Sequence, residues 1–279
     1  MRDRIGFLQG RLSPPVNGLV QAFPWPSWEE EFPIAERLGF HLMEWTLDQD
    51  DLRQNPLLTA EGRTRIGELR RRHALDIPSL SGDCFMQAPF WKAPADRQDA
   101  LKGDFVAVAQ ACAAAGIPLM VVPVVDNGRL ETPKQEDQLM AFMQGQTRAL
   151  ASLGLRVAFE IDYGPEDIAR FIGRLDSAVF GLTYDTGNSA SLGFDPAEEL
   201  SLYGHRVVNV HVKDRLHQGP SVPLGTGHVD FEAVFSALHR VHYAGPYVLQ
   251  TARAADGDHV GALSRYRDMT SWWLSRCAA

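Results

Sequence analysis

The fold is decided by four short apolar stretches, VAFEID (157–162), FGLTYDTGN (180–188), VVNVHVKD (207–214) and YVLQT (247–251). Each is as short and as rich in β-branched and aromatic residues as a buried parallel strand, and a helical pattern follows it. One metal-competent side chain lies near the C-terminal end of each stretch; these are Glu160, Asp185, His211 and Gln250. Because all strands of a (β/α)8 barrel end at one face, we expect these four side chains to share one divalent-metal site.

The rest of the chain continues this alternation of strands and helices. The expected strands cover residues 4–9, 40–45, 76–81, 118–125, 156–162, 179–185, 207–213 and 246–251. The expected helices cover residues 27–38, 59–74, 95–115, 134–153, 165–175, 196–203, 229–242 and 258–275. Glycine closes three of these helices just ahead of a strand, at Gly39, Gly116 and Gly154, as is typical of repeated βα units. We therefore predict an α/β fold, a TIM barrel that forms a single domain over residues 1–279.

Composition narrows the classes of partner and location. The formal net charge of −8 disfavours a nucleic-acid partner, because binding to nucleic-acid phosphates requires a basic protein surface. No apolar run approaches the ~20 residues that span a bilayer, and MRDRIGFLQG (1–10) lacks the long apolar region of a signal peptide. The three cysteines have no CxxC spacing, which indicates neither a disulfide framework nor a zinc ribbon. We expect a cytoplasmic protein with no nucleic-acid or membrane partner, and a homo-oligomer is possible.

Several motifs carry a resemblance to a known family. They are IGFLQGRLSP (5–14), Glu160 on the fifth strand, YDTGN (184–188), NVHVKD (209–214) and PLGTGHVDF (223–231). With them the chain resembles the xylose-isomerase-like TIM-barrel superfamily of sugar and sugar-phosphate isomerases and epimerases, which includes D-tagatose 3-epimerase and L-xylulose-5-phosphate 3-epimerase. The resemblance extends from residue 5 to about residue 251. It implies a small carbohydrate substrate and a role in carbohydrate metabolism.

The resemblance also implies a ligand set. In the family, a Glu, an Asp, a His and a second Glu bind a divalent metal, and the two Glu residues are the acid and the base. Carried over, Glu160 is a ligand and the base, and Asp185 and His211 are ligands. The fourth position holds Gln250, whose amide oxygen can bind a metal but cannot accept a proton near neutral pH. Mixed oxygen and imidazole ligands favour Mn²⁺ or Zn²⁺, with Mg²⁺ or Co²⁺ as alternatives.

The exchange of Glu for Gln leaves the second proton-transfer group open, since two-base epimerisation needs an acceptor on one face and a donor on the other. Glu44, at the end of the second strand, is the expected substitute, and His228 is a candidate general acid. Further candidates that reach the same face are Asp126, Asp162 and Lys213.

Five residues at the barrel mouth are expected to contact the substrate, namely Gln9, Arg11, Asn188, Lys213 and Asp214. For three of these residues, a purely structural role is the alternative to substrate contact. Lys213 and Asp214 could form a structural pair, and Arg11 could be a solvated loop charge.

The expected function is metal-dependent isomerisation or epimerisation of a sugar, sugar phosphate or cyclitol. It proceeds by proton abstraction next to a carbonyl, through an enediolate. A keto-sugar or inosose dehydratase would use the same metal-enolate chemistry and expel a β-hydroxyl. An inactive sugar-binding barrel is the alternative from a different class.

Overall fold

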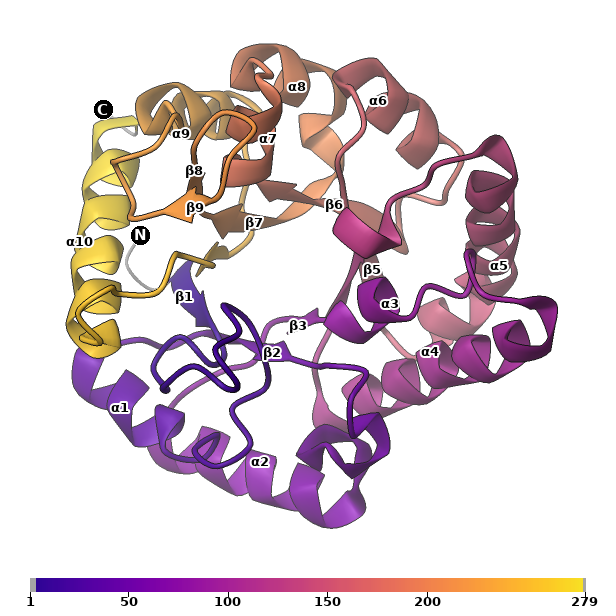
Figure 1. The fold of residues 1–279 in the computed structure, drawn as a ribbon, viewed down its shortest axis with the longest axis horizontal. Coiled ribbons are helices and arrows are strands. Elements are labelled where there is room, and N and C mark those ends of the chain that lie inside the picture. The colour runs from indigo at the N-terminus through magenta and orange to yellow at the C-terminus, as the bar shows by residue number, and fades with distance from the viewer. Residues whose placement is uncertain (1–3, 278–279) are drawn as a thin grey trace.

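Eight parallel strands close into a ring in the computed structural model, which describes residues 4–277 (Figure 1). In chain order they are β1 (Ile5–Leu8), β2 (Met43–Thr46), β3 (Leu80–Ser81), β4 (Leu119–Val124), β5 (Arg156–Ile161), β6 (Phe180–Asp185), β7 (Val207–Val212) and β10 (Tyr247–Leu249). Around the ring the order is β1-β10-β7-β6-β5-β4-β3-β2, and β1 pairs with both β10 and β2. The predicted TIM barrel is confirmed.

Helices surround this ring (Figure 1). They are α1 (Glu31–Leu38), α2 (Ala60–His73), α3 (Asp83–Gln87), α4 (Ala95–Ala115), α5 (Pro133–Ser152), α6 (Pro165–Gly173), α7 (Thr186–Leu192), α8 (Pro196–Tyr203), α9 (Phe231–Arg240) and α10 (His259–Cys277). Short 3-10 turns cover η2 (Leu52–Gln54), η3 (Pro56–Leu58), η4 (Asp126–Gly128) and η5 (Gly204–Arg206). Apolar helix faces cover the strands. Phe171 of α6, for example, packs edge-on against Phe159 of β5, with ring centroids 5.3 Å apart.

All eight predicted strands form, and the differences lie at boundaries and in short elements. The third strand shrinks from 76–81 to Leu80–Ser81, with only a bridge between Leu42 and Asp76 before it. The helix expected from residue 229 begins at Phe231, because the Asp230 carboxylate accepts a hydrogen bond from the Ala233 N–H at 2.9 Å and caps it. The elements α3, α7 and a small hairpin of β8 (Asp214–Arg215) and β9 (Ser221–Val222) were not predicted, because they are too short to show a periodic pattern.

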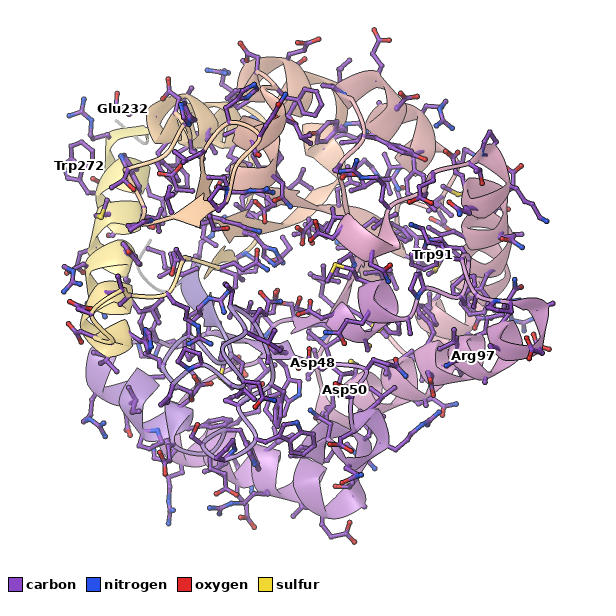
Figure 2. All side chains as sticks on the ribbon, viewed as in Figure 1. Asp48, Asp50, Trp91, Arg97, Glu232 and Trp272 are labelled. Atoms are coloured by element: carbon purple, nitrogen blue, oxygen red, sulfur yellow. The ribbon has the colours of Figure 1, made fainter. Side chains whose placement is uncertain are left out.

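Polar side chains occupy the inside of the barrel below its mouth. Glu44 of β2 and Asn209 and His211 of β7 are each completely buried. Two strands, β1 and β10, separate β2 from β7 in the ring, so contacts between these side chains cross the barrel interior. The outer surface differs: Trp272 on α10 is exposed on the outside (Figure 2).

Within residues 4–277, no helix has the length and apolarity needed to cross a membrane. The predicted single domain over 1–279 stays a prediction, and its ends, residues 1–3 and 278–279, lie outside the described residues.

Candidate metal centre

Three neighbouring strands bring three of the four predicted ligands together. Glu160 is on β5, Asp185 ends β6, and His211 is on β7, where it is paired in register with Asp185. One ligand atom from each residue lies within 4.8 Å of the other two, and all three side chains are buried. Buried carboxylates this close to each other and to an imidazole repel one another unless a cation or protons compensate their charge. The arrangement can therefore hold a divalent metal.

His211 is held between two carboxylates. Its Nε2 lies 2.8 Å from Glu44 Oε1, and its Nδ1 lies 3.2 Å from Glu160 Oε2. Burial alone would lower the pKa of His211, but Glu44 and Glu160 outweigh it and raise the pKa well above its ordinary value. Despite the short distance to Glu160, the Nδ1 atom makes no hydrogen bond of good geometry within the described residues. A buried ring nitrogen without a partner that faces a carboxylate fits a metal ligand.

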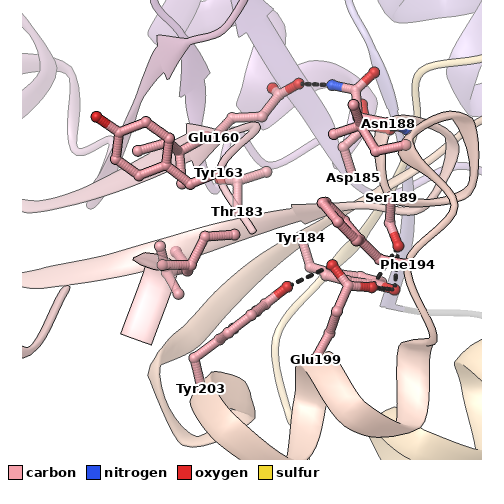
Figure 3. A pocket seen from close by; sticks show the side chains of 14 residues that line it. Glu160, Tyr163, Thr183, Tyr184, Asp185, Asn188, Ser189, Phe194, Glu199 and Tyr203 are labelled. Carbon is pink, nitrogen blue, oxygen red and sulfur yellow. Dashed lines mark hydrogen bonds between the residues drawn. The ribbon is translucent and has the colours of Figure 1, made fainter. Parts of the chain in front are cut away.

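The two carboxylates of the centre are also oriented by α7, as Figure 3 shows for Glu160 and Asn188. Asn188 Nδ2 donates to Glu160 Oε1 at 2.7 Å, and the Asn188 backbone N–H donates to Asp185 Oδ1 at 2.8 Å. Asp185 therefore caps α7 with one oxygen and keeps Oδ2 for the centre, where Lys213 Nζ lies 3.2 Å away. Both carboxylates present one oxygen to the centre while the other is fixed.

Gln250 follows β10 and shares Lys213 with Asp185. Its Oε1 accepts from Lys213 Nζ at 3.3 Å, and its Nε2 donates to Gln21 Oε1 at 3.0 Å. The amide oxygen is thus on the side of the centre and the amide nitrogen on the side of the β1 loop. Its use as a fourth ligand stays a prediction.

A polar cavity of about 300 Å³ opens at the C-terminal ends of the strands beside this centre. The lining includes the predicted residues Arg11, Glu160, Asn188, Lys213 and Gln250. Three cationic side chains line the cavity, those of Arg11, Lys213 and Arg215. Three carboxylates line it as well, those of Asp83, Asp126 and Glu160. Such a volume with convergent polar groups suits a small polyhydroxylated ligand.

Arg11 owes its position to a buried carboxylate beneath the loop after β1. Glu31 accepts hydrogen bonds from the backbone N–H groups of Gly10 (3.0 and 2.8 Å to its two oxygens) and Leu12 (2.9 Å). Burial raises the pKa of Glu31 to about 7, against the effect of these backbone donors. Burial and the neighbouring Arg253 lower the pKa of Arg11 to about 9, against the opposing charges of Asp83 and Glu31.

Two predicted substrate contacts lie outside the lining of this cavity. Gln9 is completely buried, its Oε1 accepts from the Thr46 N–H at 3.2 Å, and it does not line the cavity. Asp214 is buried as well, and its carboxylate accepts from the backbone N–H groups of Gly225 (2.9 Å), Gly227 (2.9 Å) and Val229 (3.2 Å). Asp214 therefore holds the loop after β9, whereas its neighbour Lys213 faces the cavity.

The two expected substitutes for the missing Glu also lie elsewhere. Glu44 sits inside the barrel, where Ser79 Oγ (2.6 Å) and Asn209 Nδ2 (2.9 Å) donate to its Oε2, and it does not line the cavity. His228 is exposed on a loop, and its Nδ1 accepts from the His217 N–H at 3.0 Å. Neither placement supports proton transfer to a ligand in the cavity.

The cavity is also lined by Asp83, Gln21 and Arg215, which were not among the predicted site residues. Asp83 follows β3 by two residues, the same position relative to a strand end that singled out other candidates, so this signal was available. Gln21 lies in an irregular loop after β1 and carries no such signal.

The comparisons with known proteins agree with this architecture. A family model described as xylose isomerase-like TIM barrel matches residues 32–273. The chain belongs to the xylose isomerase-like TIM-barrel family. Membership confirms the resemblance inferred from the motifs of the sequence.

Individual relatives extend over most of the chain. The L-ribulose-5-phosphate 3-epimerase UlaE of Escherichia coli (strain SMS-3-5 / SECEC) is 26% identical over 266 residues, which cover 90% of each chain. The structure of D-allulose 3-epimerase from Methylomonas sp. has a TM-score of 0.74 at 18% identity, covering 97% of this chain and 98% of that one. That of the IOLI protein with a bound zinc atom has a TM-score of 0.77 at 14% identity, covering 98% of both. At these identities the two structures are evidence for the fold.

Proposed function

We propose that this chain is a divalent-metal-dependent isomerase or epimerase of a small sugar, sugar phosphate or cyclitol. One observation carries the proposal: Glu160, Asp185 and His211 offer ligand atoms within 4.8 Å of one another, next to a polar cavity. The inside of a barrel mouth is where enzymes of this architecture bind their substrates. The relative UlaE, an L-ribulose-5-phosphate 3-epimerase, supports this class of reaction. A cytoplasmic location and a homo-oligomer stay predictions.

Glu160, Asp185 and His211 would hold the metal, with Gln250 as a fourth ligand. The unpartnered Nδ1 of His211 and the oxygen of Asp185 that faces the centre fit this set. Mn²⁺ and Zn²⁺ suit the mixture of oxygen and imidazole, and Mg²⁺ and Co²⁺ are the alternatives. Once bound, such an ion polarises a carbonyl and acidifies the adjacent C–H bond.

The protein's own residues would supply the proton chemistry and the binding. Glu160 would act as the general base, and the hydrogen bond from Asn188 Nδ2 at 2.7 Å fixes the direction of its carboxylate. Lys213 and Arg11 would bind substrate oxygens, because both line the cavity and carry positive charge. Glu44 would position His211 through the contact at 2.8 Å.

A dehydratase that expels a β-hydroxyl from a keto-sugar is the second candidate. The neutral Gln250 favours this reaction, because elimination needs only one strong base and position 250 offers no second one. Its amide oxygen instead accepts from Lys213 Nζ at 3.3 Å. An unsaturated product would distinguish this reaction from epimerisation.

The experiment is solvent-deuterium incorporation, read by NMR, with Mn²⁺ or Zn²⁺ added to the purified protein. The probes are D-tagatose, D-allulose and L-ribulose 5-phosphate, each with a C–H next to a carbonyl. We expect deuterium at that carbon in at least one probe, and, for the epimer that Glu160 deprotonates, a loss of ~10²-fold or more in Glu160→Gln, as for a lost general base. No incorporation from any probe would contradict the proposal and favour the inactive sugar-binding barrel.

A further inference from the structure

Asp83 enters the cavity from the side opposite the predicted ligands. The strands of those ligands, β5, β6, β7 and β10, are consecutive in the ring. Asp83 begins α3 directly after β3, within the remaining arc of β4, β3, β2 and β1. Asp83 and Glu160 both line the cavity. A ligand held between the two arcs therefore has one carboxyl group on the side of the metal centre and another on the opposite side.

Asp83 is fixed by two donors, and one of them connects it to Gln250. Ser81 Oγ donates to Asp83 Oδ1 at 3.0 Å, and Gln21 Nε2 donates to Asp83 Oδ2 in a short hydrogen bond. Gln21 Oε1 in turn accepts from Gln250 Nε2 at 3.0 Å. An amide at position 250 can donate this last hydrogen bond, whereas a carboxylate there would be an acceptor alone. Gln250 stands where the family has a basic Glu, and through Gln21 it helps to orient the carboxyl group of Asp83 instead.

The surroundings of Asp83 suit proton transfer near neutral pH. Its side chain is almost completely buried. Burial and the nearby Asp48, which Figure 2 labels beside Asp50, raise the pKa of Asp83 to about 7, against the hydrogen bonds from Gln21 and Ser81 and with a smaller contribution from Glu160. A group with such a value is present both as acid and as base at neutral pH, which is the most effective range for general acid–base catalysis.

We propose that Asp83 is the second proton-transfer residue of this site and replaces the carboxylate that position 250 lacks. The inference rests on the proposed function. The Glu160 carboxylate takes the proton from the carbon next to the carbonyl, the C–H bond breaks, and its electron pair gives the enediolate. The Asp83 carboxyl group then donates its proton to the same carbon from the opposite face, a new C–H bond forms, and the carbonyl is restored. Glu160 is left protonated and Asp83 ionised, and exchange with solvent water resets both.

The test separates hydrogen exchange from inversion. Wild-type protein, Asp83→Asn and Glu160→Gln are incubated with Mn²⁺ in D₂O with D-tagatose, D-allulose or L-ribulose 5-phosphate, and then with the epimer of the responsive probe. NMR reads deuterium and configuration at the reacting carbon. From the epimer that Glu160 deprotonates, Asp83→Asn is expected to keep exchange within about threefold and to lose inversion by ~10²-fold or more. From the opposite epimer, Glu160→Gln is expected to keep exchange while Asp83→Asn loses it.

A matched control removes a carboxylate far from the cavity. Asp99 is 98% exposed on the outer helix α4, so Asp99→Asn changes the charge without touching the site. This variant is expected to keep both exchange and inversion. Asp83→Glu, which retains a titratable carboxyl group, is expected to recover part of the inversion. Circular dichroism and Mn²⁺ content establish that each variant is folded and loaded.

The outcomes distinguish the two proposals. If the wild-type protein exchanges no hydrogen in any probe, the proposed function fails, and the assignment of Asp83 fails with it. If the wild-type protein inverts a probe and Asp83→Asn inverts it equally well, only the assignment of Asp83 is overturned. Loss of exchange from both epimers in a folded, Mn²⁺-loaded Asp83→Asn would also overturn it, because such a result assigns Asp83 to binding.

Discussion

Glu44 and His211 contact each other inside the barrel, with Glu44 Oε1 2.8 Å from His211 Nε2 and both side chains completely buried. Because a carboxylate only accepts hydrogen bonds, Nε2 carries a proton in this contact, and Nδ1 is the ring nitrogen that faces Glu160. Ser79 and Asn209 hold Glu44 in turn, at 2.6 and 2.9 Å. The direction of a predicted metal ligand is thus set by residues that never reach the cavity.

The first prediction concerns this contact. Glu44→Gln is expected to lower Mn²⁺ affinity by ~10–100-fold, because a partner of a ligating His that fixes the tautomer is lost. Isothermal titration measures the affinity. Glu136→Gln is the control: Glu136 is also buried but pairs with Arg170 on the outer helices, so its loss should leave Mn²⁺ affinity unchanged. Equal affinities of wild type and Glu44→Gln would refute the role of Glu44.

Gln250→Glu is the second test. The added charge lies beside Asp185 and Lys213, so Mn²⁺ should bind more tightly. Turnover is expected to fall, because the variant loses the donor to Gln21 that orients Asp83 and because extra negative charge opposes formation of an enediolate. Metal affinity and the stereochemistry of the product are measured together. A variant that binds Mn²⁺ better and works as fast as wild type would show that the amide has no part in the reaction.

Lys213 provides a third test, because its ammonium lies 3.2 Å from Asp185 Oδ2 and 3.3 Å from Gln250 Oε1. A fixed positive charge at this distance opposes a cation at the same carboxylate. Lys213→Met should therefore increase Mn²⁺ affinity by about tenfold while it weakens binding of the substrate. Lys102→Met, on the outer helix α4, is the comparison and should change neither. Weaker Mn²⁺ binding in Lys213→Met would contradict this account of the centre.

A fourth prediction concerns pH and Glu31. Its pKa is about 7 in the folded chain against 4.5 as the reference value, so the folded state binds the proton more tightly. The stability that this provides is complete below the reference value and is lost as the pH rises through about 7. Between pH 5 and pH 8, the free energy of unfolding of the wild type should fall by about 2 kcal/mol relative to Glu31→Gln. Urea unfolding at both pH values measures it, and a parallel dependence of the two proteins would refute it.

Much of the barrel could be predicted from the sequence, because each strand is a short apolar run ahead of a helix. Glu160, Asp185 and His211 could be predicted for the same reason: they end such runs, and strand ends converge in a barrel.

What the pattern could not provide is the direction of each side chain. Lys213 and Asp214 are neighbours, yet one faces the cavity and the other holds a loop. Glu44 was expected at the end of its strand, but it is the second residue of β2, and its carboxylate points into the barrel and contacts His211.

The central claim is a divalent-metal centre made by Glu160, Asp185 and His211. It is tested most directly by the metal content of the purified protein after equilibration with Mn²⁺ or Zn²⁺, measured by elemental analysis beside His211→Ala. We expect one ion per chain in the wild type and a strongly reduced content in the folded variant. A wild-type protein without bound metal, or a variant with the same content, would contradict the account.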